Sequence, residues 1–474
     1  MAVTAWAGSA LQAPASTAIA GPAYVPLAKG AVTFNKDIAP ILFENCASCH
    51  RPGEVAPFSL LSYDDAKKRA KQIAIVTEKH IMPPWKAEAG HEEFINSRRL
   101  TDRQIGLIKQ WAAEGALEGA AKDLPPAPKF TAGWQLGEPQ AVLQADESYA
   151  LAADGADVYR CFVIPTDYAE DRYIAAMEVR PENRAIVHHV IAFLDTRGAA
   201  RKLDAAAAGP GYTSFGGVGF APSGTLGGWA PGNVPQRTPP GTGILLPKGA
   251  DIVLQVHYHP SGKPETDRTK IGLYFSEGPI DKRVRVLALM NPGLRIPAGA
   301  KNHEVRAGHT LTSDATILAV MPHMHLLGRD MTINAQLPDG KEKRLVRVVD
   351  WDFNWQTTYS FKQPVQLPAG SRLEAVSHYD NSADNPRNPN DPPRAVTWGE
   401  QTTDEMCFAF IPYTDDAEHL AQGVIGADSP ADFGGGQQKF FEALLKRFDK
   451  NGDGKLGAEE RAAARAAMRG VSGK

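Results

Sequence analysis

Short runs of alternating apolar and polar residues, separated by Gly, Pro, Asn and Asp, fill the chain from about Gln135 to Tyr413. Examples are "DVYRCFVIP", "ADIVLQVHYHP", "ATILAVMPHMH" and "SRLEAVSHYDN". Because side chains alternate between the two faces of a strand, this texture is typical of half-buried strands joined by turns. The stretch is long enough for two antiparallel sandwich or jelly-roll-like units, with a candidate seam at "LMNPGLRIPAGA" near residue 290.

The chain before this region has a helical pattern. "FNKDIAPILFENC" and "LTDRQIGLIKQWAAEGAL" place apolar residues at i, i+3, i+4 and i+7, and the Pro-rich "KDLPPAPKFTAG" then reads as a linker. The first thirty residues are Ala-rich and carry no charge before Lys29. They read either as the apolar and cleavage portions of a secretory signal without its basic start, or as a disordered leader.

We therefore expect a multidomain protein. The expected parts are a leader at 1–30, an α-helical domain at 31–122, mainly-β domains at 131–287 and 288–420, and a C-terminal helix-loop-helix at 433–474. The formal net charge of -3 is close to neutral, and no basic stripe favours a nucleic-acid partner. No apolar run is long enough to span a bilayer.

The helical part contains "ENCASCHRPG", with Cys46, Cys49 and His50. In C-x-x-C-H, two thiols bond covalently to haem while the histidine reaches the iron. Half of a zinc site is the alternative, with His80 and His91 as further ligands.

The segment resembles a class I c-type cytochrome over nearly its whole length, including the closing helix with Trp111. A sixth ligand follows in "KHIMPPW", where Met82 precedes two prolines and His80 is the competitor. Haem c is attached outside the bacterial cytoplasm, so this resemblance predicts a periplasmic or secreted protein.

Histidines of the β-rich region fall in close pairs: "AIVHHVIAF" carries His188 and His189, "LQVHYHP" carries His257 and His259, and "MPHMHLLG" carries His323 and His325. Three pairs in apolar settings are hard to satisfy without a metal, yet imidazole suits zinc, copper, iron and nickel alike. Adjacent His188 and His189 can share one metal only if the strand has a bulge or ends there.

Four ordered motifs, "VHH", "QVHY", "HMH" and "TTDEMCF", make the region from Gln135 to Tyr413 resemble the type II copper, ascorbate-dependent monooxygenases, the family of peptidylglycine alpha-hydroxylating and dopamine beta-monooxygenases. The resemblance implies two copper ions on two β-sandwiches. The electron-transfer copper would be held by His188, His189 and His257. The oxygen-binding copper would be held by His323, His325 and Met406, which would also be the catalytic residues.

Departures from the family concern the substrate. In the peptidylglycine branch an arginine anchors the substrate carboxylate two residues before H-x-H, and here that residue is Met321. Phe408 and Phe410 replace that branch's asparagine and tyrosine, and "DEMCFAF" is closer to the dopamine branch. An apolar lining predicts a neutral or weakly polar small substrate.

Near the end, "DKNGDGKLGAEE" matches an EF-hand calcium loop. Its coordinating positions are Asp449, Asn451, Asp453, Lys455 and Glu460. The two remaining cysteines, Cys161 and Cys407, either pair or stay as buried thiols.

The whole chain thus predicts a modular extracytoplasmic copper monooxygenase, with two copper ions, one haem c and calcium. It would take dioxygen, a small-molecule substrate and an upstream electron donor, and pass electrons through the tethered haem. Two alternatives stay open, namely a non-catalytic electron-transfer or copper-handling protein, and a zinc-binding structural β protein.

Overall fold

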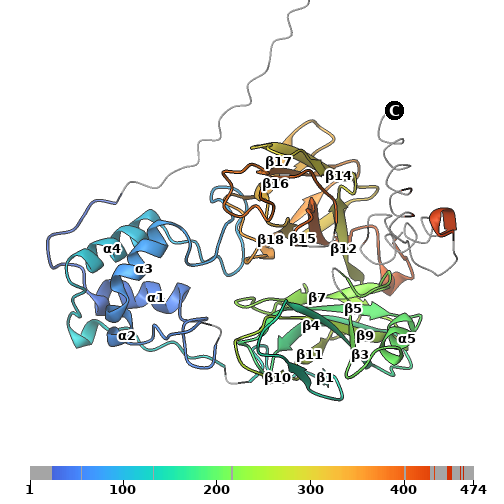
Figure 1. Cartoon of the computed structure of the whole chain (residues 1–474), viewed down its shortest axis with the longest axis horizontal. Helices are drawn as coiled ribbons and strands as arrows, with labels where there is room; N and C mark the ends of the chain where they lie inside the picture. The colour runs from blue at the N-terminus through green and yellow to red at the C-terminus, as the bar shows by residue number, and fades with distance from the viewer. Residues whose placement is uncertain are drawn as a thin grey trace, which may run out of the picture.

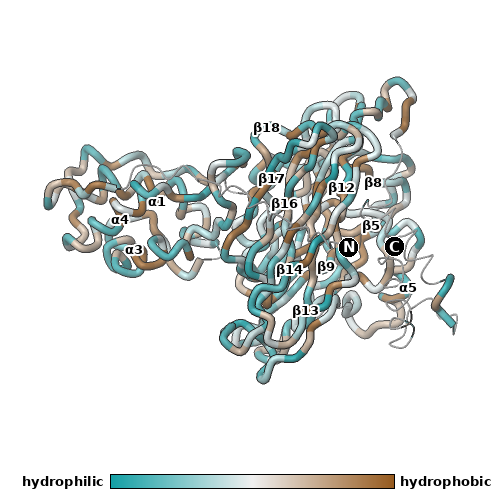
Figure 2. The backbone as a smooth tube through the Cα atoms, turned by 90° about the horizontal axis from the view of Figure 1, so that it is seen from above, coloured by the Kyte–Doolittle hydropathy of each residue, from teal (hydrophilic) through white to brown (hydrophobic). Residues whose placement is uncertain are grey.

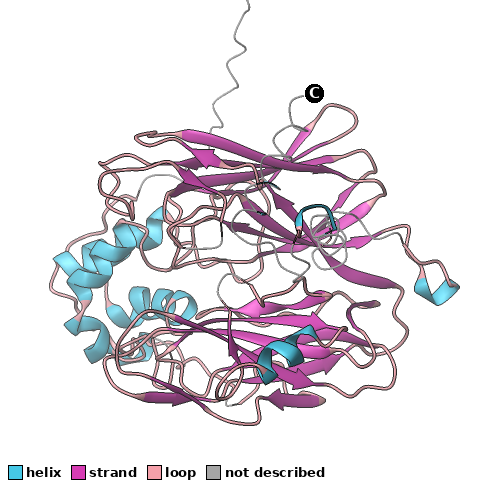
Figure 3. Ribbon diagram, turned by 45° about the vertical axis from the view of Figure 1, so that its right-hand side comes forward, coloured by secondary structure: helices cyan, strands magenta, loops and turns pink. Residues whose placement is uncertain are grey.

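The computed structural model describes residues 24–426 except 55, 132, 215–216 and 400–401, together with Asp432, 446–450, Glu460 and Ala463. Within these residues the protein is mainly β with few helices. Two β units are stacked on each other, and the helices of the N-terminal part lie beside them (Figure 1, Figure 3).

The N-terminal helices pack around one small core. Thr101 begins α4 with a capping box, since its hydroxyl accepts from the Gln104 backbone N–H while the Gln104 side chain accepts from the Thr101 N–H. Trp111 of α4 is fully buried and donates from its ring nitrogen to Leu117 O. The elements are η1 (Phe34–Ile38), α1 (Ala39–Asn45), α2 (Tyr63–Lys68), α3 (Ala70–Glu78), α4 (Asp102–Ala113) and η2 (Ala121–Asp123).

The first β unit is a sandwich of a five-stranded sheet, in the order β6-β3-β9-β5-β7, and half of a longer sheet, in the order β1-β11-β4-β8. Apolar side chains from both sheets form one buried cluster, as expected for facing sheets. The elements are β1 (Ala141–Gln144), β2 (Tyr149–Leu151), β3 (Val158–Pro165), β4 (Arg172–Arg180), β5 (Val187–Asp195), α5 (Ala199–Ala205), β6 (Tyr212–Thr213), β7 (Gly224–Trp229), β8 (Thr242–Leu246), β9 (Asp251–Tyr258), β10 (Glu265–Asp267) and β11 (Lys270–Phe275).

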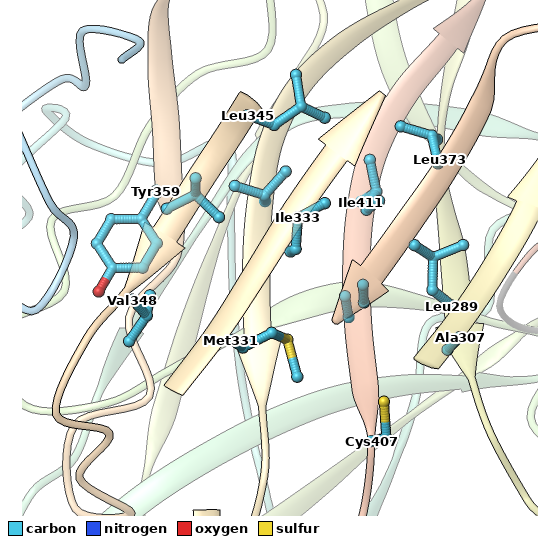
Figure 4. Close-up of a cluster of buried hydrophobic side chains, with 14 of the residues drawn as sticks. Leu289, Ala307, Met331, Ile333, Leu345, Val348, Tyr359, Leu373, Cys407 and Ile411 are labelled. Atoms are coloured by element: carbon cyan, nitrogen blue, oxygen red, sulfur yellow. The ribbon is translucent and has the colours of Figure 1, made fainter. Parts of the chain in front are cut away.

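The second β unit packs the other half of the long sheet, β12-β21-β15-β18, against a four-stranded sheet in the order β14-β19-β16-β17. Figure 4 shows its core, where Leu289, Ile411 and Tyr359 of the long sheet face Ile333, Leu345 and Leu373. The elements are β12 (Lys282–Met290), β13 (Arg295–Ile296), β14 (His303–Thr310), β15 (Ala315–His323), β16 (Gly328–Gln336), β17 (Glu342–Val348), β18 (Tyr359–Leu367), β19 (Arg372–Tyr379), β20 (Val396–Thr397), β21 (Phe408–Asp415) and η3 (Leu420–Gln422).

One strand joins the two sandwiches. β12 pairs in parallel with β8 of the first sandwich over Lys282 and Arg283, and antiparallel with β21 of the second over its remaining length. The boundary predicted at 287/288 therefore falls inside β12, because the alternating run "RVRVLALM" continues as a strand across the expected seam.

A segment of the helical part, residues 85–95, is bonded to the second sandwich, and we call it the bridging segment. Its backbone pairs with β17 and β18 at Ala87↔Val348 and Phe94↔Phe361. Trp85 packs edge-on against Tyr359 with ring centroids 5.1 Å apart and belongs to the sandwich core. The helical part, which projects to one side in Figure 2, is thus held by sheet-like contacts.

Neither remaining cysteine is in a disulfide. Cys161 on β3 and Cys407 before β21 are buried free thiols in different sandwiches, which settles the alternative left open by the sequence. No helix in the described part of the chain is both long and apolar enough to cross a membrane.

Candidate metal centres

Three imidazoles meet on the outward face of the five-stranded sheet, and we call His188, His189 and His257 the first centre. His189 on β5 lies directly opposite His257 on β9. The Nδ1 atom of His189 is 3.2 Å from Nδ1 of His188 and 3.3 Å from Nδ1 of His257. Two nitrogens that each lie 2.0–2.1 Å from one tetrahedral metal are about 3.3 Å apart, so this spacing fits a shared ion.

β5 is irregular at His188 and His189, where a shared metal requires a bulge or a strand end. The β5–β9 register shifts between Val187 and His189, so that His188 is the extra residue of a bulge. In a regular strand His188 and His189 would face opposite sides. The bulge turns the His188 ring to the side of its neighbour.

Asp157 decides which nitrogen of His257 faces the metal. Its carboxylate lies 2.7 Å from His257 Nε2 and 2.7 Å from His259 Nδ1. A carboxylate only accepts, so the His257 proton resides on Nε2 and the Nδ1 lone pair points into the centre. His259, whose side chain is 69% exposed, lies outside the trio.

The second centre is His323, His325 and Met406. β15 ends at His323, and His325 follows in the next turn, with the two rings 5.2 Å apart and perpendicular. His323 Nδ1 is 2.6 Å from Gln356 Oε1, and His325 Nδ1 is 3.2 Å from Asp404 O. Both partners accept, so the proton of each ring lies on Nδ1 and the lone pair on Nε2.

A buried carboxylate joins the backbone of Met406 to that of His325. His323, the last residue of β15, pairs with Phe408, which follows Met406 by two residues. The Glu405 carboxylate accepts from the backbone N–H groups of His325 at 2.9 Å, Leu327 at 2.7 Å and Met406 at 3.1 Å. Glu405 therefore ties the two ligand-bearing segments together, although burial raises its pKa to about 8.

Burial keeps these imidazoles neutral. It lowers the pKa of His257 to about 4, with the Asp157 hydrogen bond opposing it, and lowers that of His323 to about 3, with the charge of His325 adding to it. The pKa of His189 is lowered further by burial and by charges on its neighbours, of which His323 is one. The two centres are thus within electrostatic reach of each other, and neutral imidazole is the form that binds a metal.

Both centres open into one cavity of about 2010 Å³. Its lining comes from both sandwiches and from the helical part, where Ser48 and Arg98 contribute. Next to the second centre the wall is apolar. It consists of Met321, Phe408 and Phe410, of which the last two stack with ring centroids 4.5 Å apart.

The C-x-x-C-H motif forms a tight turn after α1. The backbone N–H groups of Cys49 and His50 both donate to Cys46 O, at 3.2 and 2.9 Å. Both thiols are free, and burial raises the pKa of Cys46 to about 12. His50 Nδ1 lies 3.2 Å from Phe58 O, which leaves the Nε2 lone pair for an iron ion. This geometry fits covalent haem.

The axial-ligand candidates lie in the loop after α3. Met82 is half-buried and its backbone N–H donates to Val76 O at 3.2 Å, whereas His80 is exposed. The loop runs directly into the bridging segment at Trp85. Met82 and His80 therefore both remain candidates for the second ligand of a haem iron.

Of the EF-hand loop, Asn451, Asp453 and Lys455 lie outside the described residues. The two ends of the loop are described, and the Lys450 backbone N–H donates to Glu460 Oε1 at 2.8 Å. Asp449 and Glu460 are thus the only predicted calcium ligands whose placement the structure describes.

Sequence reasoning did not single out the residues that orient the ligands. Asp157, Gln356 and Glu405 lie 100, 33 and 80 residues from the histidines that they contact. Nothing in the local sequence marks Asp157 or Gln356, while Glu405 was at least part of the "DEM" motif.

The architecture defines a class of protein: two stacked β-sandwiches, each presenting imidazoles to a shared cavity that Met406 also lines. Comparison with known proteins is more specific. Residues 285–422 match the C-terminal domain of the copper type II ascorbate-dependent monooxygenases. This match contains His323, His325 and Met406.

A human protein named DBH-like monooxygenase protein 1 is 26% identical over 209 residues, which covers 39% of this chain and 32% of the relative. The chain thus matches about a third of that relative's length. Together the two findings show similarity to the copper type II monooxygenase family.

Likeness to solved structures is weak. The major capsid protein P2 of bacteriophage PM2 is 10% identical, covers 58% of this chain and 97% of its own, and gives a TM-score of 0.24. A capsid structure of infectious bursal disease virus is 10% identical, covers 70% of this chain and 90% of its own, and gives a TM-score of 0.16. Scores this low carry no argument.

Proposed function

We propose that this protein is a copper-dependent monooxygenase that hydroxylates a C–H bond of a neutral or weakly polar small substrate with dioxygen. The observation that carries the proposal is the placement of two unlike imidazole centres on one cavity, the second of which lies within the residues 285–422 that match this family. Copper bound at the two centres would supply one-electron redox chemistry and dioxygen activation.

The chain's own residues divide the work between the centres. His188, His189 and His257 would hold one copper ion through nitrogen alone. His323, His325 and Met406 would hold the other, where a soft thioether favours Cu(I), the state that meets dioxygen. Asp157, Gln356 and Glu405 keep the rings and the methionine segment in place, so the ligands need little rearrangement.

The substrate would lie against the apolar wall beside the second centre. Met321 stands where the peptidylglycine branch has its carboxylate-binding arginine, and Phe408 and Phe410 extend the same face. Burying an unpaired substrate carboxylate there would be costly. A substrate without charge near the reacting C–H bond is therefore favoured.

Electrons would reach the copper centres through a tethered haem c, held covalently by Cys46 and Cys49 and axially by His50 and Met82. Tethering raises the effective concentration of the donor. An upstream donor would reduce the haem, and haem attachment places the protein in the periplasm or outside the cell. We also propose that Asp449, Asn451, Asp453, Lys455 and Glu460 bind calcium.

The decisive experiment combines metal analysis with isotope labelling. Purified protein is expected to bind two copper ions, to show an electron spin resonance signal when oxidised, and to incorporate oxygen-18 from ¹⁸O₂ into a product during screening of metabolite extracts. Copper without labelled product would favour an electron-transfer or copper-handling protein. Zinc at both centres would favour a structural role.

A further inference from the structure

The C-x-x-C-H turn approaches the first sandwich at Gly232. Gly232, in the loop after β7, has φ +86°, and a Cβ there would lie 3.5 Å from Cys49 Sγ and 3.1 Å from Arg98 Nη1. Arg98 Nη1 also donates to Gly232 O at 3.0 Å, while its buried Nε has no partner. A side chain at this position would be strained by the positive φ and crowded by Arg98, whereas 3.5 Å from Cys49 Sγ is an ordinary van der Waals contact.

An ion pair anchors the same interface from the other side. Glu54, five residues after Cys49, pairs with Arg184, four residues before His188. Both side chains are largely buried, at 13% and 23% exposed, and Glu54 is also held by Arg51 at 2.7 Å. Partly buried, multiply bonded pairs fix geometry better than exposed ones.

The path from Gly232 to the first centre is short. Trp229, three residues earlier and the last residue of β7, pairs with Val190, the neighbour of His189. Trp229, Gly232, His189 and Ser48 of the C-x-x-C-H turn all line the same cavity. Three residues of backbone and the pairing of β7 with β5 thus connect Gly232 to the neighbour of His189.

We propose that the contact between Cys49 and Gly232 is where electrons enter the copper domains, and that they enter at the first centre. This inference rests on the proposed function, because a thioether at Cys49 would bond the porphyrin to the very sulfur that faces Gly232. In each transfer one electron leaves ferrous haem, which becomes ferric, and reduces Cu(II) at His188, His189 and His257 to Cu(I). An external one-electron donor then restores ferrous haem.

The test uses the full-length holoprotein without substrate. It follows one optical signal, the absorbance of ferrous haem, and one magnetic signal, the resonance of Cu(II). After anaerobic photoreduction of the haem by a flavin, the ferrous haem absorbance should decay as the Cu(II) resonance of the first centre is lost. In Gly232→Ala the added methyl lies 3.1 Å from Arg98 Nη1, so Arg98 or the loop must shift by a few tenths of an ångström. A misplacement of about 1 Å costs at most roughly a hundredfold, so this smaller shift predicts a decay that is slower by about two- to fivefold.

Gly262→Ala is the matched control. Gly262 lies in the same sandwich with φ +88° and has no atom within 4 Å of its Cβ position, so this variant carries equal backbone strain without the clash. Its transfer rate should equal that of the wild type. The haem midpoint potential and copper content should stay unchanged in both variants.

A second pair of variants tests the anchor. Glu54→Arg and Arg184→Glu should each slow the transfer, and the double variant, which restores opposite charges, should recover it. Equal rates in wild type, Gly232→Ala and the charge variants would overturn the entry contact while leaving haem as the donor. If Trp85→Leu alone slowed the transfer, the entry contact at Gly232 would also be overturned. Electrons would then enter through Tyr359. Haem that stays ferrous beside Cu(II) in the wild type would overturn the proposed electron supply itself.

Discussion

The two candidate metal centres use opposite nitrogens of their histidines. At the first centre Asp157 holds Nε2 of His257, and three Nδ1 atoms converge. At the second, Gln356 and Asp404 hold Nδ1 of His323 and His325, and the lone pairs lie on Nε2. The rings are therefore oriented by their hydrogen-bond partners, and residue type alone does not reveal which nitrogen binds.

The centres also differ in how the backbone assembles them. The first gathers its ligands across neighbouring strands and needs a bulge to bring His188 round. The second lies where β15 ends, and a buried carboxylate joins its turn to Met406. The first centre thus consists of imidazoles on two paired strands, whereas the second includes a histidine beyond the end of β15.

Removing one ligand from each centre should have the largest effect. We expect His257→Ala and His325→Ala each to lose one of two copper ions and to lower product formation on the order of 10³-fold, since a bound metal supplies several kcal/mol. If both variants lose the same copper ion, the two histidine clusters are not separate copper sites. Copper content and electron spin resonance spectra decide this, with His303→Ala on β14 as the control that should keep both ions.

The orienting partners should act on one centre each. We expect Asp157→Ala to weaken copper binding at the first centre by about 10–100-fold and Gln356→Ala to do so only at the second. Competitive chelator titrations of the two variants measure both affinities. Each variant serves as the control for the other, and a loss at the wrong centre would contradict the assigned tautomers.

Glu405 should matter for the second centre and for stability. In Glu405→Gln an amide N–H₂ replaces an oxygen that accepts backbone N–H groups, so we expect the free energy of unfolding to fall by about 1–3 kcal/mol. Urea unfolding measures this change, and X-ray absorption should show weaker copper–sulfur scattering. Glu304→Gln, at an exposed carboxylate on β14, should change stability by less than about 0.5 kcal/mol.

Acid should destabilise the copper-free protein through both centres. The folded-state pKa values of His257, about 4, and His323, about 3, lie below the unfolded value near 6.5, so the unfolded chain binds more protons once the pH falls below 6.5. Each histidine then lowers the free energy of unfolding by up to about 1.4 kcal/mol per pH unit, until the pH reaches its pKa in the folded state. Urea midpoints between pH 7.5 and 4.5 test this, and His323→Gln should flatten the slope. An unchanged slope would show that His323 is not a buried histidine with a lowered pKa.

Several features could be read from the sequence because they depend on local pattern. The helices around Cys46 and Trp111, the strands around each histidine pair, and the need for a bulge at His188 all follow from side-chain periodicity and turn residues. The order of the motifs also indicated which histidines belong together. Of the pair in "QVHYHP", the structure brings His257 to His188 and His189 and leaves His259 exposed.

Other features depend on contacts between distant parts of the chain. Periodicity placed Trp85 with the helices, but its ring completes the core of the second sandwich beside Tyr359. The same reasoning set a domain seam inside β12, which in fact joins both sandwiches. Local sequence carries no record of which surface an apolar ring or strand edge will meet.

By itself, then, the sequence determined the inventory of this protein: helical and β regions, three imidazole pairs, a thioether in a recognisable motif, and a C-x-x-C-H turn. Only the tertiary structure decided which nitrogen faces each centre, which carboxylates hold them, and that all three parts share one cavity. The reason is physical. Periodicity is set by bonds between near neighbours, whereas tautomers, register and docking are set by partners tens to hundreds of residues away.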